Sequence, residues 1–429
     1  MSKRSAFPPV FWVANGIELL ERFSYYGIYF GFGIYMQSLG YSRGQLGVVQ
    51  SIFLTLSYVM PVISGTLADR YGFKRMLLVS YVAYLPTILL LQYTRSFSGI
   101  ALTMLGIGFA AGIFKPLISG TVRTTTDITN KTLGFGIFYA IVNIGGSFGP
   151  IVAGNLRDRS WNHVFAASAI AICVMFVVTL LFYKEPEREL DKQSLGAKFR
   201  EIGVVLADLK FTAFLVLLGV FFWLPFWAFF NLCALYVDNN IDTVALYRDL
   251  HGVFGERVTS VFSAVGEDGQ RRVLGETISH TGWIIMIFQI FVSRVSERYR
   301  AMPTFMLGLG LAALGFFTLG YARVGAASLV FVGIALFAIG EMFASPRIQE
   351  YITWIAPKEK AGLYMGTNFL ATCIGALLSG VTYTPLSGYF VDTGHAEYIW
   401  YVMGVHTLVA VGAFALFTRV AGEFAVQER

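Results

Sequence analysis

Three charged side chains lie inside the first long apolar run of the chain, residues 10–36. They are Glu18, Glu21 and Arg22. On an α-helix they recur with Tyr25 at three- and four-residue steps, so that they share one stripe. An ionisable group at the centre of a bilayer costs about 2.5 to 3.5 kcal/mol. The run therefore predicts a helix inside a polytopic bundle, with its charged stripe facing protein or an aqueous cavity.

The composition is that of an integral membrane protein. The 429 residues are 56% hydrophobic and only 14% charged, with a mean hydropathy of +0.64, whereas soluble domains are about 25% charged. Apolar runs of 18 residues or more indicate membrane spans. We predict an all-α membrane protein with two groups of six transmembrane helices, at residues 8–37, 44–68, 75–93, 98–122, 131–155 and 163–183, and at 211–236, 275–294, 302–321, 326–349, 361–388 and 398–418.

A polar linker, residues 184–210, separates an N-terminal six-helix bundle (1–183) from a C-terminal one (211–429). Lys and Arg are more numerous in the linker and in the loops on the side of the N-terminus, which predicts that both termini are cytoplasmic. The formal charge of +6 then reflects topology and not nucleic-acid binding. The first apolar run is too long and too charged for a cleaved signal peptide, and we expect a multi-pass protein of the inner (plasma) membrane.

Two short patterns occur once in each half, which predicts an internal duplication. Asp69-Arg70-Tyr71 follows the second predicted span, and Glu297-Arg298-Tyr299 follows the eighth. Gly-rich segments begin at Asn143 in the fifth span and at Asn368 in the eleventh. The first pattern extends over Gly65 to Arg75 and suggests a cytoplasmic latch that involves Asp69 and Arg70. The alternative is an ordinary positively charged loop.

Lys115 and Glu341 are further charges within predicted spans, beside Pro116 and Pro346. Each lies about 15 to 17 residues, roughly 25 Å, from the outer end of its span. Equal depth makes an ion pair between the two halves available, and such a pair would break when water enters. We predict a gate formed by Lys115 and Glu341, the alternative being a fixed ion pair that fastens two helices.

No pattern indicates an enzyme or a metal site. The three cysteines fall within predicted spans without metal-ligand spacing, and the five histidines lie mostly at span ends or in loops, without nucleophile partners. We expect no cofactor.

The Gly65 to Arg75 segment resembles the signature loop of the major facilitator superfamily. Within that superfamily the chain is similar to the proton-dependent oligopeptide transporters. The resemblance rests on motifs in both halves: Glu18-x-x-Glu21-Arg22-Phe23-x-Tyr25-Tyr26, Tyr58-x-x-Pro61, Lys115-Pro116, Asn143-Ile144-Gly145, Gly340-Glu341 and Ser345-Pro346. It implies a proton symporter that imports di- and tripeptides, with the proton as the coupling ion.

The resemblance also implies roles for individual residues. Arg22, Tyr26 and Lys115 would hold the substrate carboxylate, Asn143 and Glu341 would meet its amino end, and Tyr58 would line the pocket. Glu18 and Glu21 would pair with Arg22 and Lys115 in combinations that depend on protonation. The predicted substrate-binding set also contains Ser345, Asn231 and Asn368.

The departures from the family pattern leave the cargo open. Asn231 stands where the family usually has an acid, and Tyr29 stands where its arginine partner is common. Thr281-Gly282 replaces a usual Asn-Pro, and Asn368 replaces an aromatic residue. We expect a monomer in the lipid bilayer that binds a peptide or small-molecule substrate. Alternatives are an efflux transporter of a small amphipathic metabolite or drug, and a non-transporting membrane sensor.

The outward loop, residues 237–274, predicts one amphipathic helix from the spacing of its apolar residues. These are Val244, Tyr247, Leu250, Phe254, Val258, Val261 and Val265. The helix would rest on the membrane surface or close over the entrance as a lid.

Overall fold

The computed structural model describes residues 6–127, 130–187, 194–266, 268–323, 325–356, 361–422 and 424. Eleven helices in this part of the chain are long and apolar enough to cross a membrane. Helix α1 (Pro9–Ser38) is not one of the eleven, although its 30 residues are sufficient to span a bilayer. It is the helix that carries Glu18, Glu21 and Arg22. Together these helices confirm the predicted all-α membrane fold and match the twelve predicted spans.

The chain divides into two compact units. The first unit contains residues 1–35 and 52–199, and the second contains residues 36–51 and 200–429. The division therefore falls inside α1 and inside α2 (Arg43–Tyr71), so that the end of α1 and the start of α2 pack with the second unit.

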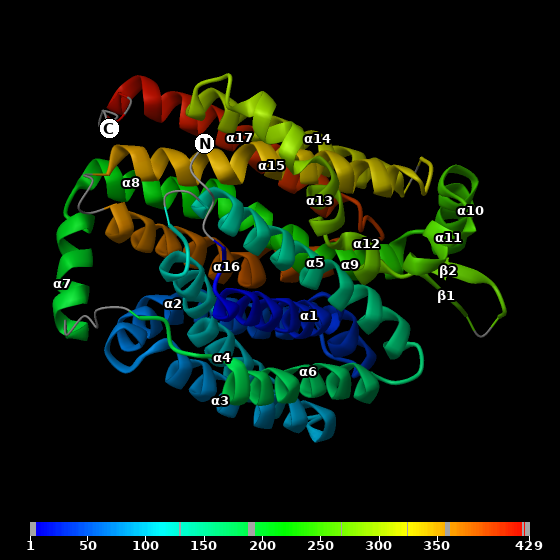
Figure 1. Cartoon of the computed structure of the whole chain (residues 1–429). Coiled ribbons are helices and arrows are strands. Elements are labelled where there is room, and N and C mark those ends of the chain that lie inside the picture. Colours follow the sequence, from blue (N-terminus) through cyan, green and yellow to red (C-terminus); the bar gives the residue numbers. More distant parts are fainter. Residues whose placement is uncertain are drawn as a thin grey trace. The chain divides into compact units, whose positions relative to one another are not determined.

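Long helices joined by short connections form the first unit. Helices α3, α4 and α6 lie side by side (Figure 1). Serine side chains start two of these helices, since Ser96 accepts a hydrogen bond from the Gly99 N–H and Ser160 accepts one from the Asn162 N–H. The helices that follow α2 are α3 (Phe73–Tyr93), α4 (Phe97–Thr124), α5 (Lys131–Arg157), α6 (Trp161–Phe182) and the start of α7 (Leu195–Leu206).

Glycines bring neighbouring helices of the first unit into backbone contact. A Cβ on Gly145 of α5 would lie 2.4 Å from the Leu19 carbonyl oxygen of α1, and one on Gly149 would lie 2.4 Å from the Phe23 carbonyl oxygen. Real Cβ atoms do not approach backbone this closely. The Gly-rich segment that begins at Asn143 therefore packs closely against the charged part of α1.

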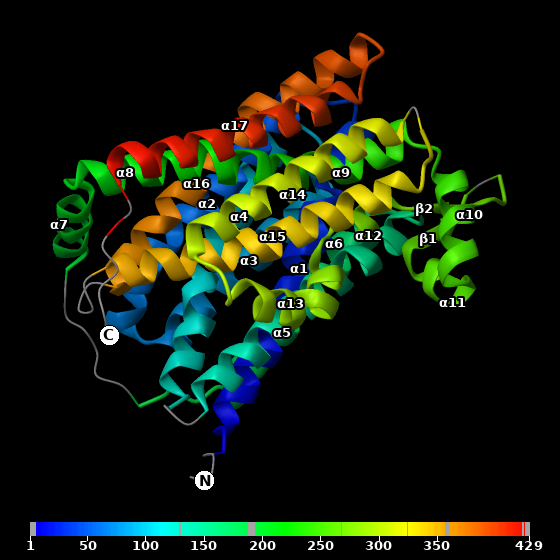
Figure 2. The ribbon, with the colours of Figure 1, turned by 90° about the horizontal axis from the view of Figure 1, so that it is seen from above.

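The second unit contains the remaining helices and a small hairpin. Helices α14, α15 and α17 lie side by side in it (Figure 2). Its elements are α8 (Leu209–Leu217), η1 (Leu218–Trp223), α9 (Leu224–Asn240), α10 (Thr243–Phe254), α11 (Glu256–Thr259), η2 (Ser260–Phe262), β1 (Ser263–Val265), β2 (Arg271–Val273), α12 (Gly275–Ser279), α13 (Gly282–Ser296), α14 (Ala301–Ala322), α15 (Leu329–Ile355), α16 (Ala361–Asp392) and α17 (Tyr398–Ala421).

The predicted span at residues 211–236 is not a uniform α-helix. Its middle, η1, is a π-helical segment of six residues between α8 and α9. A Cβ on Gly375 of α16 would lie 2.3 Å from the Cβ of Trp223, so that α16 packs directly against this segment. π-Helical turns inside α-helices occur frequently at functional sites.

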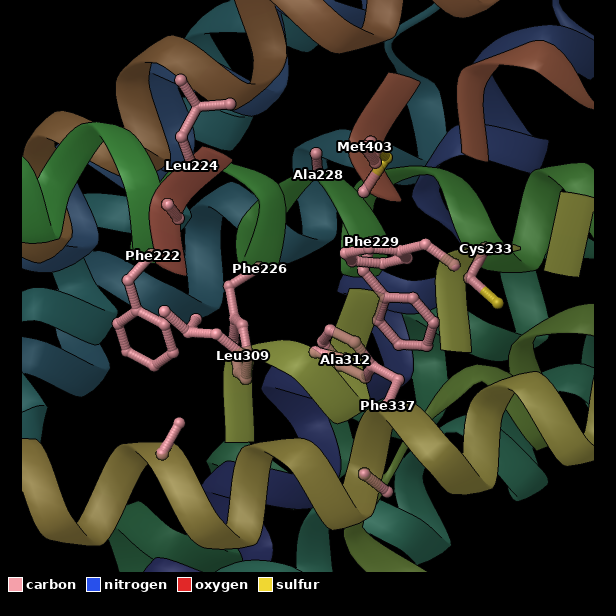
Figure 3. Close-up of a cluster of buried hydrophobic side chains, with 14 of the residues drawn as sticks. Phe222, Leu224, Phe226, Ala228, Phe229, Cys233, Leu309, Ala312, Phe337 and Met403 are labelled. Atoms are coloured by element: carbon pink, nitrogen blue, oxygen red, sulfur yellow. The ribbon is translucent and has the colours of Figure 1, made fainter. Parts of the chain in front are cut away.

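Aromatic side chains fill the core of the second unit. Phe229 of α9 and Phe337 of α15 stack with ring centroids 3.9 Å apart, and Phe226 lies 4.7 Å from the same ring of α15. Figure 3 shows this cluster together with Met403 of α17 and Leu309 of α14. The cluster joins four helices and fixes α9 and α15 relative to each other within the unit.

The loop at residues 237–274 differs from its prediction. Asp242 caps α10 by accepting hydrogen bonds from the Val244 and Ala245 N–H groups. The helix ends at Phe254, because Gly255 follows with a φ of +75°, a conformation that favours glycine. The chain then forms α11, η2 and the antiparallel hairpin β1–β2 beside α10 (Figure 2). A single helix that extends to Val265 is therefore wrong, and Val265 belongs to β1.

Candidate functional site

One arginine is shared by two glutamates at the centre of α1. The Arg22 Nε lies 2.8 Å from the Glu18 Oε1 and 3.0 Å from the Glu21 Oε2. All three residues are buried, with exposed fractions of 2% for Glu18, 0% for Glu21 and 6% for Arg22. The predicted stripe therefore exists, and it faces the interior of the first unit.

A tyrosine from α3 completes this cluster. The Tyr84 hydroxyl donates a hydrogen bond of 2.7 Å to the Glu21 Oε1, and its side chain is fully buried. The packing of α5 holds the cluster from another direction, because a Cβ on Gly145 would lie 2.8 Å from the Arg22 Cβ. Three helices thus fix the two carboxylates and their arginine.

Lys115 of α4 lies among aromatic rings of the first unit. Its Nζ is 3.8 Å from the centre of the Tyr58 ring and 5.1 Å from that of the Tyr25 ring. It donates a hydrogen bond of 3.3 Å to the Ser57 carbonyl oxygen. Among the described residues of this unit, no carboxylate lies within ion-pair distance of Lys115. Glu18 and Glu21 pair with Arg22, and an exchange of partners with Lys115 stays a prediction.

The other predicted residues of the first unit lie beside this cluster. Tyr26 follows Arg22 by one turn of α1, and its ring centre is 6.0 Å from the Arg22 Cζ. Asn143 of α5 is buried and donates a hydrogen bond of 2.9 Å to the Tyr139 carbonyl oxygen of its own helix. The structure thus gathers Glu18, Glu21, Arg22 and Tyr26 on one helix, while a role of Asn143 in substrate binding stays a prediction.

Glu341 of α15 has a partner that the sequence did not indicate. The Thr281 hydroxyl donates a hydrogen bond of 2.9 Å to the Glu341 Oε2. Thr281 lies where the predicted span at residues 275–294 breaks between α12 and α13. Ser345 follows Glu341 by one turn, and its buried hydroxyl has no hydrogen-bond partner among the residues that the structure describes. These groups form a polar patch on the second unit.

The two asparagines of the second unit have different surroundings. Asn368 of α16 is 7% exposed, and within the described ranges its Oδ1 has no hydrogen-bond partner. Asn231 of α9 belongs to a separate network. The Asn231 Nδ2 donates a hydrogen bond of 3.0 Å to the Ser379 Oγ. The main-chain carbonyl oxygen of Asn231 accepts a hydrogen bond of 3.2 Å from the Gln50 Nε2. Their predicted contacts with substrate stay predictions.

The predicted latch motif is helical and not a loop. Helix α2 continues through Asp69 and Arg70 to Tyr71, and Gly72, with a φ of +93°, is the single residue before α3. The Glu185 carboxylate caps α3 by accepting 2.7 Å hydrogen bonds from the Phe73 and Lys74 N–H groups. A latch function of Asp69 and Arg70 stays a prediction. The gate of Lys115 and Glu341 also stays a prediction, because the two residues belong to different units.

Sequence reasoning missed the contacts of Tyr84, Thr281 and Gln50. Each is an uncharged polar residue inside or beside a predicted span, and the signal that could have found them is the need of a buried hydroxyl or amide for a partner. That need does not say which partner is chosen. Within the described ranges, no group of three or more His, Cys, Asp or Glu side chains could hold a metal ion.

The family model described as Major Facilitator Superfamily matches residues 16–380 and again residues 254–425. The chain therefore belongs to the major facilitator superfamily, a class of membrane transporters with the helical fold described above.

Several curated proteins are related over most of their length. The "Uncharacterized transporter YclF" of Bacillus subtilis (strain 168) is 23% identical, over 85% of this chain and 86% of that protein. The "Tetracycline resistance protein, class H" of Pasteurella multocida is 23% identical over 80% of each chain. The "Dipeptide and tripeptide permease A" of Edwardsiella piscicida is 22% identical, over 94% of this chain and 91% of that protein.

Similar solved structures include several transporters of the POT family. One, in complex with 5-aminolevulinic acid, has a TM-score of 0.73 and 20% identity, covering 95% of this chain and 96% of that chain. Another, a peptide transporter POT in complex with sulfate, has a TM-score of 0.77 and 18% identity, covering 98% of this chain and 96% of that chain. The predicted fold and the resemblance to the proton-dependent oligopeptide transporters are confirmed.

Proposed function

We propose that the chain is a proton-coupled symporter that imports di- and tripeptides, or related small zwitterions and carboxylates, by alternating access. The transporting unit in this proposal is the monomer, in the inner (plasma) membrane with both termini cytoplasmic. Peptide permease A and the POT-family structures support the substrate class. One POT-family structure contains 5-aminolevulinic acid, a small molecule with a carboxylate and an amino group.

The surroundings of Lys115 carry the proposal. Its ammonium group lies among the Tyr58 and Tyr25 rings and the Ser57 carbonyl oxygen. It has no ion pair within the described part of the first unit, whereas Arg22 already contacts two carboxylates. A partly buried ammonium gains most from an anionic partner. A substrate carboxylate supplies that partner, while the aromatic faces keep the ammonium in place.

The second unit offers groups that suit the amino end of the substrate. The Glu341 carboxylate accepts a hydrogen bond from Thr281 through one oxygen, so that its other oxygen is available to an ammonium group. The Ser345 hydroxyl and the Asn368 Oδ1 are buried acceptors without partners among the described residues. Buried polar atoms are usually satisfied, and a zwitterion with several N–H donors would satisfy them.

The test is uptake by the purified full-length chain in proteoliposomes with an imposed inward proton gradient. Labelled dialanine, trialanine and 5-aminolevulinic acid are the probes. We expect gradient-dependent accumulation of at least one probe, and its loss in Lys115→Ala and Glu341→Ala. Lys210→Ala is the matched control, because the Lys210 Nζ also lies over an aromatic ring, at 4.4 Å from that of Phe424, but at the start of α8.

Uptake that is unaffected by both Lys115→Ala and Glu341→Ala would refute the proposal. The tetracycline resistance relative makes efflux the principal alternative. Efflux would be indicated by outward movement of tetracycline in exchange for protons that enter down the imposed gradient. All three probes would then fail to exchange in counterflow.

A further inference from the structure

Four apolar side chains are exposed on the segment that joins α10 to the hairpin, outside the spanning helices. They are Val253 and Phe254 at the end of α10, Val258 of α11 and Val261 of η2, with exposed fractions between 43% and 76%. These four residues are called the apolar patch below. Single exposed apolar residues are common on proteins, but several together mark a surface that contacts something else.

The apolar side of α10 extends beyond the protein that covers it. Leu246, Leu250 and Val253 recur at steps of four and three residues, so that they share one side of the helix. Leu246 and Leu250 are buried, and α10 packs against β2. Val253 continues the same side but is 76% exposed. The last turn of α10 therefore presents an apolar side that no described part of the chain covers.

The apolar patch adjoins the side of α13 that faces lipid. Trp283, Ile287 and Ile290 share one side of α13 by the same spacing. Ile287 and Ile290 are exposed, as expected where a spanning helix meets hydrocarbon. Phe262, the residue after Val261, packs on Trp283 with ring centroids 5.8 Å apart. The patch therefore continues, at the start of α13, the surface that this helix presents to the bilayer.

The first turn of α15 gives the depth of the apolar patch. Phe331 is the third residue of α15, and its ring centre is 5.4 Å from that of Phe254 and 5.2 Å from that of Trp283. The ends of spanning helices lie at the boundary between hydrocarbon and headgroups, where tryptophan is enriched. Phe254 therefore lies at the depth of the lipid headgroups.

Hydrogen bonds fasten the segment to the start of α12. The Phe262 carbonyl oxygen accepts a hydrogen bond of 3.0 Å from the Leu274 N–H and one of 2.9 Å from the Thr277 hydroxyl. The Asp238 Oδ1 accepts a hydrogen bond of 2.6 Å from the Gly275 N–H. A lid would have to break such contacts when it opens, whereas an anchor keeps them. The contacts therefore favour an anchor.

We propose that the apolar patch is an interfacial anchor that inserts into the phospholipid leaflet at this end of the second unit, and that Arg257 binds a lipid phosphate. Arg257 is exposed within the patch, directly before Val258. Apolar side chains beside basic ones are typical of helices that lie in the plane of the membrane interface, and a guanidinium matches the geometry of a phosphate. The anchor would hold α12, and with it the break at Thr281, at a fixed depth.

The test is spin labelling of the full-length chain in phosphatidylcholine vesicles. Cys173 and Cys373 are replaced by alanine, while Cys233 is buried and should not label. A nitroxide is then attached to Val258→Cys, and its collisions with O2, which concentrates in hydrocarbon, are compared with those of a water-soluble nickel complex. We expect an O2-to-nickel collision ratio several-fold higher than in Arg248→Cys. Arg248 is the matched control, because it is exposed on the side of α10 opposite Leu246.

Two results would overturn the anchor. Equal ratios at the two labelled positions would place the patch in water. Low collision with both reagents at position 258 would mean that protein, such as a second copy of the chain, covers it. The same measurement on a label at Val261→Cys guards against a local distortion by the first label.

A charge reversal tests the phosphate contact. In the Val258→Cys background, Arg257→Glu should lower the O2-to-nickel ratio of the label, because a carboxylate is repelled by phosphate and moves the patch toward water. Arg248→Glu is the control and should leave the ratio unchanged. A ratio that is the same in both variants would overturn the role of Arg257. These measurements need neither substrate nor a proton gradient, so that they decide the anchor even if no uptake is observed.

Discussion

Gly47 of α2 and Gly380 of α16 are in direct backbone contact. A Cβ on Gly47 would lie 2.1 Å from the Gly380 carbonyl oxygen, and a Cβ on Gly380 would lie 2.4 Å from the Gly47 carbonyl oxygen. Both residues belong to the second unit. Contact of this kind is typical of small residues at helix interfaces in membranes, where close approach replaces the hydrophobic effect as the source of attraction.

Gly47→Ala should therefore destabilise the protein, because the new methyl group collides with backbone that cannot move aside as a side chain can. Overpacking of this kind costs about 1 to 3 kcal/mol. The measurement is the thermal unfolding midpoint of the purified protein in detergent. Gly65→Ala on the same helix is the control, since a Cβ there meets nothing within 4 Å, and alanine favours the helix by roughly 0.5 to 1 kcal/mol. Equal midpoints for the two variants would contradict the contact.

Gln50 connects the start of α2 to two other helices of the second unit. Its Oε1 accepts a hydrogen bond of 2.9 Å from the Thr384 hydroxyl, and its Nε2 donates to the Asn231 carbonyl oxygen. In a double-mutant cycle, Gln50→Leu and Thr384→Val should be coupled by about 0.5 to 1.5 kcal/mol. Thr382→Val replaces Thr384→Val in the control cycle, because Thr382 is exposed and bonds its own helix. Additive effects in both cycles would exclude the hydrogen bond.

Tyr58 should contribute to transport through its ring and not through its hydroxyl. The Lys115 Nζ lies 3.8 Å from the ring centre, and a cation above an aromatic face gains about 0.5 to 2 kcal/mol. Tyr58→Phe should leave uptake close to that of the unaltered protein, while Tyr58→Leu should raise the KM by a factor of about 2 to 30. Initial uptake rates in proteoliposomes measure both. Similar losses in both variants would instead assign the role to the hydroxyl.

Glu397, at the start of α17, makes stability depend on pH. Burial raises the pKa of its carboxyl, but hydrogen bonds from its own backbone N–H and from Arg323 lower the pKa further than burial raises it. A carboxyl with a lowered pKa in the folded state stabilises the fold above its unfolded pKa, and this contribution is lost as the pH falls through the folded pKa.

Arg323→Ala should therefore lower the unfolding midpoint at pH 7, and the difference should shrink on acidification below about pH 4. Arg248→Ala, an exposed arginine on α10, serves as the control and should change the midpoint little at either pH. A loss in Arg323→Ala that is the same at pH 7 and at pH 3.5 would mean that the arginine acts through packing and not through Glu397.

The positions of the spans could be predicted from the sequence because a bilayer requires long apolar runs and leaves few alternatives. The predicted span at residues 131–155 corresponds to α5 (Lys131–Arg157), and that at 398–418 corresponds to α17 (Tyr398–Ala421). The charged stripe of α1 could also be predicted, because helical spacing alone places Glu18, Glu21 and Arg22 on one face.

The contacts that make these charges chemically distinct could not be predicted. Whether Tyr84 donates to Glu21 depends on how α3 is rotated and placed against α1, which helical periodicity does not specify. The pairing of Thr281 with Glu341 depends on the break between α12 and α13, and hydropathy does not detect such a break. In the loop at residues 237–274, the apolar spacing continues beyond Gly255, but the backbone conformation of that glycine ends the helix.

The π-helical segment η1 changes how the helix that contains it must be counted. Each residue of an α-helix advances the side chains by about 100°, and a π-helical turn accommodates one residue more than an α-helical turn. If residues 209–240 formed one regular α-helix with no residue removed, Asn231 and Phe229 would be rotated by about 100° relative to α8, away from Ser379 and Phe337. Deletion of one residue, such as Val220, would allow α8 and α9 to join as one regular helix and would leave these side chains facing as they do now. The orientation of half a transmembrane helix is thus kept only because one local turn absorbs an extra residue.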